Sequence, residues 1–452
     1  MMAEMSSTEN TAAIVTHGCA KNLVDSETLA PQLIRCGYHL TSDLPQASLI
    51  VVNTCGFLQS AVEEGIQSIL ELAALKSSGA CRNLVVVGCL VQRYGKKLPD
   101  LLPEVDLFLG TSHFLELENI LELHSKGKAR RLWIAAPKAL PTSHTPRLRS
   151  TGNHSAYIKI AEGCSNRCTF CKIPQLRGAY RSRTVADVLQ EARQLALEGV
   201  KEINLIAQDS TAFGTDRDEP WALVRLLELL DALPEITWVR LLYTYPDRVS
   251  RELLRTIAQS EKIVHYLDVP LQHCVAHILH RMRRTNADTD MFALIDRIRS
   301  EVPDMALRTS LMVGFPGETE SDFQQLLRFA ETVQFDHLGV FGFSPEEGTA
   351  AARLPSQINP RIREERRHML LELQQTISRR RLERLVGQTL PVLLEGVHPD
   401  TELLLAGRLA SQAPEVDGSV IITKGVATQG TVAPARVTRA HDYDVEAELL
   451  PG

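Results

Sequence analysis

Residues 162 to 171 read Glu162-Gly163-Cys164-Ser165-Asn166-Arg167-Cys168-Thr169-Phe170-Cys171. The spacing CxxxCxxC supplies three thiolates from one short loop. A cubane iron–sulfur cluster has four irons, so three thiolates leave one iron without a protein ligand. That iron can bind a further molecule, whereas a cluster with every iron ligated mostly carries electrons. The loop therefore predicts a reactive metal site.

Zinc is the alternative occupant of this loop. Structural zinc is held by four ligands, which usually come from two CxxC knuckles. The sequence has no second knuckle, and the nearest upstream histidine, His154, lies ten residues before Cys164. The spacing thus favours an iron–sulfur cluster.

The region around the loop, residues 150–382, alternates strand-like runs with helical patterns such as Val185–Glu198 and Ser321–Thr332. Such alternation predicts a partial parallel (β/α)6 barrel, with the cysteine loop at the carboxyl edge after the first strand. The expected strands are Tyr157–Ile160, Glu202–Ala207, Trp238–Tyr243, Val264–Val269, Leu307–Val313 and Asp336–Phe341.

Three further cysteines follow strand-like apolar runs in residues 11–127. We expect a parallel α/β domain here, because runs such as Leu49–Val52 are typical of strands buried on both faces. Cys19, Cys55 and Cys89 would then emerge at one carboxyl edge, where open α/β sheets bind ligands. Ordinary buried cysteines are the alternative, but the repeated position after a strand favours a second three-cysteine site.

The remaining segments have simpler signatures. Residues 1–10 are polar and are expected to form a disordered tail, and residues 128–149 are rich in Pro, Ser and Thr, which is typical of a linker. Short strand-like runs separated by Gly and Pro predict a small antiparallel barrel over residues 383–452. From Gly387 onward, four basic residues face nine acidic ones. The basic runs Arg281–Arg284 and Arg379–Arg381 are more typical of solvated helix faces than of nucleic-acid sites.

Composition limits the class of protein. The chain of 452 residues has 44% hydrophobic and 23% charged residues, a net charge of -6 and nine cysteines. The start of the sequence shows no secretory signal, and no apolar run approaches the roughly 20 residues of a membrane span. We therefore expect a cytoplasmic protein that uses its cysteines for metal or redox chemistry, with no membrane partner.

The cysteine loop, with the aromatic Phe170 before its last cysteine, resembles the signature of the radical S-adenosylmethionine superfamily. The resemblance implies a 4Fe–4S cluster on Cys164, Cys168 and Cys171. Its open iron would bind S-adenosylmethionine, which is cleaved to a 5′-deoxyadenosyl radical.

The order of the three predicted domains resembles the methylthiotransferases of this superfamily. That resemblance implies a second, auxiliary 4Fe–4S cluster on Cys19, Cys55 and Cys89, and a terminal TRAM domain, an OB-like barrel. It also implies a transferase that uses two S-adenosylmethionine per turnover. The expected partners are a low-potential electron donor, such as a flavodoxin or a ferredoxin, and the chain is expected to be a monomer.

Four strings resemble the RimO type within this family: Ile158–Cys164, Leu205–Ser210, Pro270–His273 and Ser344–Thr349. That type methylthiolates the β-carbon of an aspartate in protein S-twelve of the small ribosomal subunit. Two positions depart from its usual pattern: Lys172 stands where an apolar residue is usual, and Phe213 where tyrosine is commoner.

Several residues could contact S-adenosylmethionine. The resemblance points to Phe170 and to the run Gly314–Glu318, whose alternative is a plain turn at a helix start. Gln208 and Arg308 lie at or near expected strands, where they could also be ordinary polar groups at a barrel mouth.

Two other functions compete with this interpretation. The first is a tRNA adenosine methylthiotransferase of the same family. An RNA-reading barrel should be basic, whereas the acidic terminal segment complements a basic ribosomal protein. The second is a non-catalytic iron–sulfur electron carrier, which would need neither a barrel nor two sites with only three thiolates each.

Overall fold

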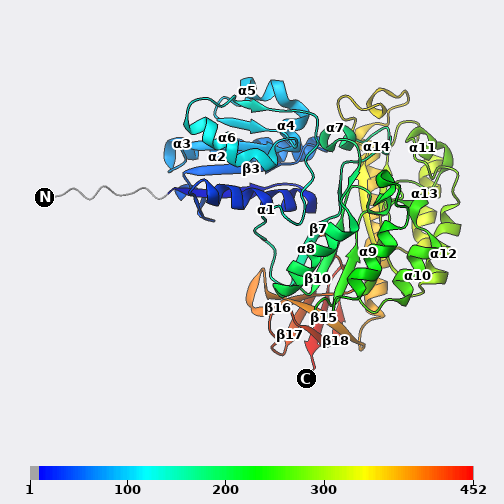
Figure 1. The fold of residues 1–452 in the computed structure, drawn as a ribbon. Helices are drawn as coiled ribbons and strands as arrows, with labels where there is room; N and C mark the ends of the chain where they lie inside the picture. Colours follow the sequence, from blue (N-terminus) through cyan, green and yellow to red (C-terminus); the bar gives the residue numbers. More distant parts are fainter. Residues whose placement is uncertain (1–9, 451–452) are drawn as a thin grey trace. The chain divides into compact units, whose positions relative to one another are not determined.

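The computed structural model describes residues 10–450 (Figure 1), so the predicted tail at 1–10 lies almost wholly outside the described residues. The chain forms two compact units. Of the described residues, the first comprises 10–150, 162–166 and 171–181, and the second comprises 151–161, 167–170 and 182–450. Within residues 10–450, no helix is long and apolar enough to cross a membrane.

A parallel sheet with strand order β2-β1-β3-β4-β5-β6 forms the centre of the first unit. The strands are β1 (Thr11–Thr16), β2 (His39–Leu40), β3 (Leu49–Thr54), β4 (Asn83–Gly88), β5 (Leu107–Leu109) and β6 (Leu132–Trp133). The helices are α1 (Ala20–Arg35), α2 (Gln59–Ala73), α3 (Leu75–Ser78), α4 (Cys89–Tyr94), α5 (Leu98–Leu101), α6 (Leu117–Ser125) and α7 (Ile173–Arg177).

Helices cover both faces of this sheet. On one face, Leu29 and Leu33 of α1 pack with Ile120 of α6. On the other face, Val62 and Ile69 of α2 pack against the sheet. Every residue of β3 is buried, as the continuous apolar run predicts for a central parallel strand.

The sheet is wider than the sequence indicates. The strands β2, β5 and β6 were not expected, and β6 lies inside the predicted linker, where it pairs with β5. Strands of two or three residues give almost no periodic signal, and their formation depends on a neighbouring strand that is already in place.

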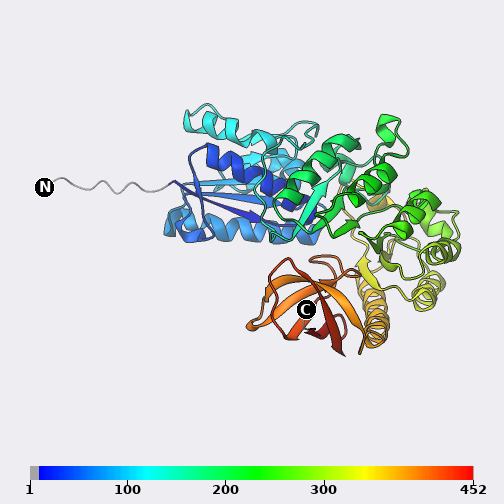
Figure 2. The same ribbon diagram turned by 60° about the horizontal axis from the view of Figure 1, so that its bottom comes forward.

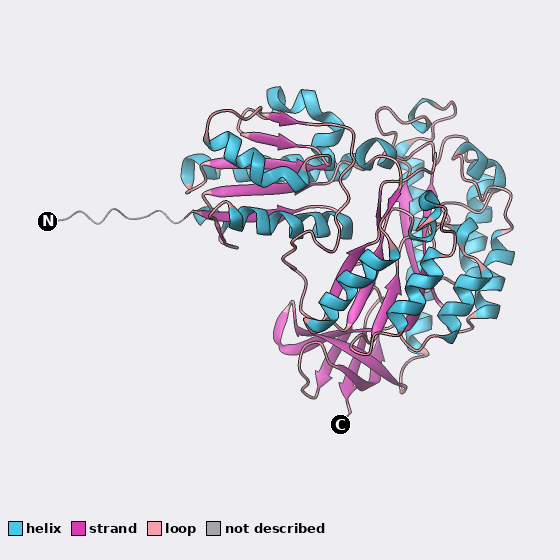
Figure 3. Ribbon diagram, viewed as in Figure 1, coloured by secondary structure: helices cyan, strands magenta, loops and turns pink. Residues whose placement is uncertain are grey.

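The second unit contains a six-stranded parallel sheet of order β14-β13-β12-β11-β10-β7, flanked by helices (Figure 3). Its strands are β7 (Ser155–Lys159), β10 (Glu202–Ile206), β11 (Trp238–Leu241), β12 (Ile263–Asp268), β13 (Ala306–Val313) and β14 (His337–Gly342). Its helices are α8 (Val185–Leu197), α9 (Ala222–Asp231), α10 (Arg251–Gln259), α11 (Ala276–Arg281), α12 (Met291–Glu301), α13 (Glu320–Val333) and α14 (Pro360–Glu383). The short strands β8 (Ala161–Glu162) and β9 (Arg181–Ser182) flank the cysteine loop in the sequence. The predicted partial barrel is confirmed.

The last five strands form a closed barrel of order β15-β16-β17-β19-β18 (Figure 2). Its neighbouring strands are antiparallel as predicted, except for β17 and β19, which pair in parallel. Its strands are β15 (Thr389–His398), β16 (Thr401–Leu409), β17 (Val420–Lys424), β18 (Val432–Ala440) and β19 (Val445–Leu449). Its core is small and aliphatic, with Val392, Val420 and Val445 fully buried. This confirms the predicted terminal barrel and adds β19, whose alternating burial was not recognised in the sequence.

A buried ionic network joins the terminal barrel to the parallel strands of the second unit. Glu202, the first residue of β10, is paired with Arg408 of β16 at 2.5 Å and with Arg240 of β11 at 3.1 Å. Glu202 and Arg240 are fully buried. Ser155, the first residue of β7, donates to the same carboxylate at 2.9 Å. The terminal barrel therefore contacts the amino ends of these strands, and the cysteine loop follows the carboxyl end of β7.

We expect Glu202→Gln to destabilise this unit strongly, because it leaves the buried guanidinium of Arg240 without a counter-charge and Arg408 with Glu395 alone. Removing one partner of a buried pair costs about 3–5 kcal/mol, which chemical denaturation will measure. Arg436→Met is the control, because Arg436 and Glu448 form an exposed pair whose loss should cost at most about 1 kcal/mol. An equally small effect of Glu202→Gln would contradict the expectation.

The same network makes stability depend on acid. Burial opposes ionisation of Glu202, but Arg408 and Arg240 outweigh it and hold the pKa of this carboxyl well below its usual range. Ionised Glu202 makes its full contribution to the free energy of unfolding above the pKa that a glutamate has in the unfolded chain, about 4.3. This contribution is lost as the pH falls towards the lower pKa of Glu202 in the folded protein.

Candidate functional site: two sets of cysteines

The first unit brings Cys19, Cys55 and Cys89 to one edge of its sheet. The strands β1, β3 and β4 are neighbours, and each cysteine follows the carboxyl end of one of them. Cys19 caps α1, and Cys89 begins α4. The placement agrees with the expected convergence, and their role as ligands remains a prediction.

Two glycines allow these three loops to approach closely. A Cβ on Gly18 would lie 3.1 Å from the Cβ of Cys55 and 2.9 Å from Nδ2 of Asn22. A Cβ on Gly56 would lie 2.5 Å from the backbone oxygen of Cys89. Side chains at these positions would push the loops apart, so the glycines keep the thiols together in a set that suits a soft metal cluster.

The three thiols also interact electrostatically. Burial raises the pKa of Cys89 to about 12 and raises the pKa of Cys55. Cys19 is exposed; crowding by protein atoms opposes its ionisation, but Lys21 and Arg177 lower its pKa. Arg177 favours the thiolate of all three cysteines, and the thiolate is the form that binds metal.

Arg177 was not singled out by sequence reasoning. It ends α7 and is buried, with Nε donating to Sγ of Cys89 at 3.3 Å. Its Nη1 contacts Asp25 at 2.6 Å, and its Nη2 donates to Oδ1 of Asn22 at 2.5 Å. The 88 residues that separate Arg177 from Cys89 leave no local pattern that could reveal the contact.

Different parts of the loop with Cys164, Cys168 and Cys171 belong to different units. In the first unit, Cys164 is buried and its backbone N–H donates to the oxygen of Gly178 at 3.1 Å. In the same unit, the N–H of Ile173 donates to Sγ of Cys171 at 3.4 Å. Gly163 has φ +79°, and a Cβ there would lie 2.2 Å from the oxygen of Ala179, so only glycine fits.

Cys168 packs in the second unit. Thr169, beside it, donates from its N–H to the oxygen of Met282 and from its hydroxyl to the oxygen of Arg281. Arg284 lies with Nη1 4.0 Å from Sγ of Cys168 and stacks on the ring of Tyr245, 4.0 Å from the centroid. The expectation of a solvated basic face is wrong for Arg284, which is buried and donates to the oxygen of Pro270.

Across residues 10–450, no three His, Cys, Asp or Glu side chains lie close enough together to hold a single metal ion. A cubane cluster binds each thiolate to a different iron. Its ligands therefore need not converge as closely as those of one tetrahedral zinc, and three thiolates in each of the two sets are donors that suit a cluster.

The predicted S-adenosylmethionine residues Phe170, Gln208 and Gly314 lie near the carboxyl ends of the strands of the second unit. The ring of Phe170 meets that of Phe315 edge to face at 6.5 Å. Gly314 directly follows β13, and Gln208 follows β10. The contacts of these residues with S-adenosylmethionine remain predictions.

A buried carboxylate shapes the turn after β13. Oε2 of Glu318 accepts from the N–H groups of Gly314 and Phe315, at 2.8 and 3.3 Å. Burial raises the pKa of Glu318 to about 7, although Arg366 opposes the shift. Gly314 has φ +69°, and a Cβ would lie 2.0 Å from Cγ of Arg363. Glu318 and the close packing against Arg363 therefore fix the conformation of this turn.

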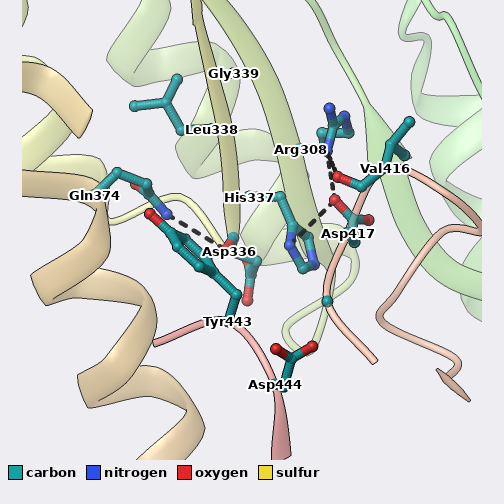
Figure 4. Close-up of a pocket in the computed structure, with 11 residues that line it drawn as sticks. Arg308, Asp336, His337, Leu338, Gly339, Gln374, Val416, Asp417, Tyr443 and Asp444 are labelled. Atoms are coloured by element: carbon teal, nitrogen blue, oxygen red, sulfur yellow. Dashed lines mark hydrogen bonds and ion pairs between the residues drawn. The ribbon is translucent and has the colours of Figure 1, made fainter. Parts of the chain in front are cut away.

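Arg308 does not lie near the carboxyl ends of the strands, where the other predicted S-adenosylmethionine residues are found. It lines a pocket of about 390 Å³ (Figure 4) and forms an ion pair with Asp417 of the terminal barrel. His337 lies 3.3 Å from the same carboxylate. Arg308 precedes Gly314 by six residues of extended strand, about 20 Å. The structure thus does not bring Arg308 together with Gly314.

A partial parallel barrel whose first strand leads into a CxxxCxxC loop defines a radical S-adenosylmethionine enzyme. Residues 158–330 match the Radical SAM superfamily. Residues 11–110 match a family described as "Uncharacterized protein family UPF0004", and residues 386–450 match the TRAM domain. Solved structures agree at the level of fold: TsrM, a radical S-adenosylmethionine methyltransferase from Kitasatospora setae, aligns with TM-score 0.55 and 14% identity over 74% of this chain and 72% of that chain.

Relatives along the whole chain give the family. A protein from Syntrophobacter fumaroxidans named "Ribosomal protein uS12 methylthiotransferase RimO" is 60% identical over 97% of this chain and 98% of its own length. A protein of the same name from Geobacter sulfurreducens is 45% identical over 99% of this chain and its own full length. The chain belongs to the RimO family of radical S-adenosylmethionine methylthiotransferases.

Proposed function

We propose that the protein methylthiolates the β-carbon of an aspartate in ribosomal protein uS12. The observation that carries the proposal is full-length similarity, at 60% identity, to a relative named for that activity. The two separate sets of three cysteines support it, because one set can hold the cluster that makes the radical and the other can hold the sulfur that is delivered.

The radical S-adenosylmethionine family implies one 4Fe–4S cluster and S-adenosylmethionine as cofactors. Cys164, Cys168 and Cys171 would hold that cluster. When bound and reduced, it supplies an electron that cleaves S-adenosylmethionine into a radical able to take hydrogen from carbon. Phe170 and the fixed turn at Gly314 would provide an apolar wall and a close backbone approach for the cofactor, and Gln208 a polar contact.

A second 4Fe–4S cluster on Cys19, Cys55 and Cys89 completes the proposal. The glycine contacts at Gly18 and Gly56 keep this set close, and Arg177 favours its thiolate forms. In the proposed reaction, this set holds the sulfur that is transferred, and one S-adenosylmethionine per turnover provides the methyl group and another the radical.

The terminal barrel is the proposed contact for uS12, but its charge is smaller than composition indicates. Two of its nine acidic residues, Asp417 and Asp442, pair with Arg308 and Arg379, which lie outside the segment and are not part of its charge count. Exposed carboxylates remain at Asp400 and Glu402, beside the exposed side chain of Leu403. We propose that this hairpin end, between β15 and β16, meets the basic substrate.

The proposal also covers the cellular location, the oligomeric state and the electron donor. The protein acts in the cytoplasm, where ribosomal proteins are found, and works as a monomer. A low-potential donor such as a flavodoxin or a ferredoxin supplies its electrons.

The test is substrate-dependent turnover by the reconstituted full chain under reducing, anaerobic conditions. We expect added uS12 to become methylthiolated while 5′-deoxyadenosine accumulates, and we expect tRNA to remain unmodified. Methylthiolation of tRNA adenosine instead would overturn the proposal in favour of the related activity. Intact clusters without any 5′-deoxyadenosine release would support a non-catalytic electron carrier.

A further inference from the structure

The guanidinium of Arg177 lies directly against one of the proposed ligands of the second cluster. Nε of Arg177 donates to Sγ of Cys89 at 3.3 Å, and both side chains are buried. A hydrogen bond from a cation to a thiolate sulfur withdraws electron density from the metal centre. Such outer contacts set the reduction potential of an iron–sulfur cluster.

The position of this guanidinium is fixed on every side. Asp25 contacts Nη1 at 2.6 Å, and Asn22 accepts from Nη2 at 2.5 Å. Asn22 in turn donates to the oxygens of His17 and Thr54, which are close in sequence to Cys19 and Cys55. The contacts therefore link Arg177 to all three cysteine loops of the set.

Arg177 also belongs to the segment that follows the other cysteine set. It lies six residues after Cys171, at the end of α7, and its Nη1 is 3.4 Å from Glu162, which precedes Cys164. All of these contacts lie inside the first unit. One side chain thus connects residues on both sides of the radical loop to the N-terminal cysteine set.

We propose that Arg177 is a positioning residue that raises the reduction potential of the cluster on Cys19, Cys55 and Cys89. The inference rests on the proposed function, because it requires that second cluster. Arg177 carries a permanent positive charge, since a guanidinium does not deprotonate in proteins. Its charge therefore favours the reduced, more negative form of the cluster at any physiological pH.

The test is a redox titration followed by electron paramagnetic resonance. The full chain with Cys164, Cys168 and Cys171 all changed to alanine is the parent, so that only the N-terminal cluster contributes. We expect Arg177→Gln to shift the oxidised-to-reduced equilibrium at least tenfold towards the oxidised form, about 59 mV for one electron. Arg177→Lys keeps the charge and should give a smaller shift in the same direction.

Arg181→Lys is the matched control. Arg181 lies in the same segment, and its guanidinium donates to the backbone oxygens of Ala179, Ala139 and Arg177. We expect the reduction potential of the cluster in Arg181→Lys to equal that in the parent. An unchanged potential in Arg177→Gln, with iron content equal to the parent, would overturn the proposal.

Iron analysis and circular dichroism separate the other outcomes. If Arg177→Gln binds no iron, the reduction potential of Arg177→Lys is compared with that of Arg181→Lys. A lower potential in Arg177→Lys supports the proposal, and an equal potential overturns it. If both Arg177 variants fold but bind no iron, Arg177 serves assembly, and its role in setting the potential is contradicted. If the parent itself binds no iron, the second cluster of the proposed function fails, and the inference fails with it.

Discussion

Changing Cys164, Cys168 and Cys171 together to alanine will abolish the release of 5′-deoxyadenosine from S-adenosylmethionine. Without these thiolates, no open iron is present to bind the cofactor and deliver an electron. Because enzymes typically accelerate their reactions by more than about 10⁶-fold, the remaining release should equal the background without protein. Chromatography of the reaction after anaerobic reduction will measure it.

Cys274→Ala is the control for this prediction. Cys274 is half-buried in the second unit and follows β12 rather than β7. Its loss should leave 5′-deoxyadenosine release unchanged. Release by the triple variant at the rate of the unmodified chain would contradict the assignment of the cysteine loop.

The second prediction separates formation of the radical from transfer of the methylthio group. Changing Cys19, Cys55 and Cys89 to alanine should stop methylthiolation of uS12 and leave 5′-deoxyadenosine release in place. The variant loses the site that holds the transferred sulfur, but it keeps the loop that binds S-adenosylmethionine. Its iron content should fall from about eight to about four per chain by the cubane assignment.

Cys36→Ala provides the matched control in the same unit. The thiol of Cys36 lies 3.9 Å from the oxygen of Glu118, away from the three-cysteine set. The Cys36→Ala variant should keep the full iron content and should methylthiolate uS12 fully. Methylthiolated uS12 made by the triple variant would show that the transferred sulfur is held elsewhere.

The sequence was sufficient where one local pattern determines the structure. The apolar run Leu49–Val52 predicts a buried strand, and the structure has β3 at Leu49–Thr54. Neighbouring parallel strands place the loops at their carboxyl ends along one edge of the sheet. The convergence of Cys19, Cys55 and Cys89 could therefore be expected before any coordinates were known.

Other features depend on residues that are distant in the sequence. The pair of Glu202 with Arg408 spans 206 positions, and the pair of Arg177 with Cys89 spans 88. Neither leaves a periodic or compositional signal. The charge count of the terminal barrel misled for the same reason, because Arg308 and Arg379, which neutralise Asp417 and Asp442, lie outside that segment.

The most direct test of the central claim is mass spectrometry of uS12 after incubation with the reconstituted chain, S-adenosylmethionine and a low-potential reductant. The account predicts one methylthio group on the β-carbon of a single aspartate, absent when S-adenosylmethionine is omitted. Unmodified uS12 in a reaction that still releases 5′-deoxyadenosine would contradict it.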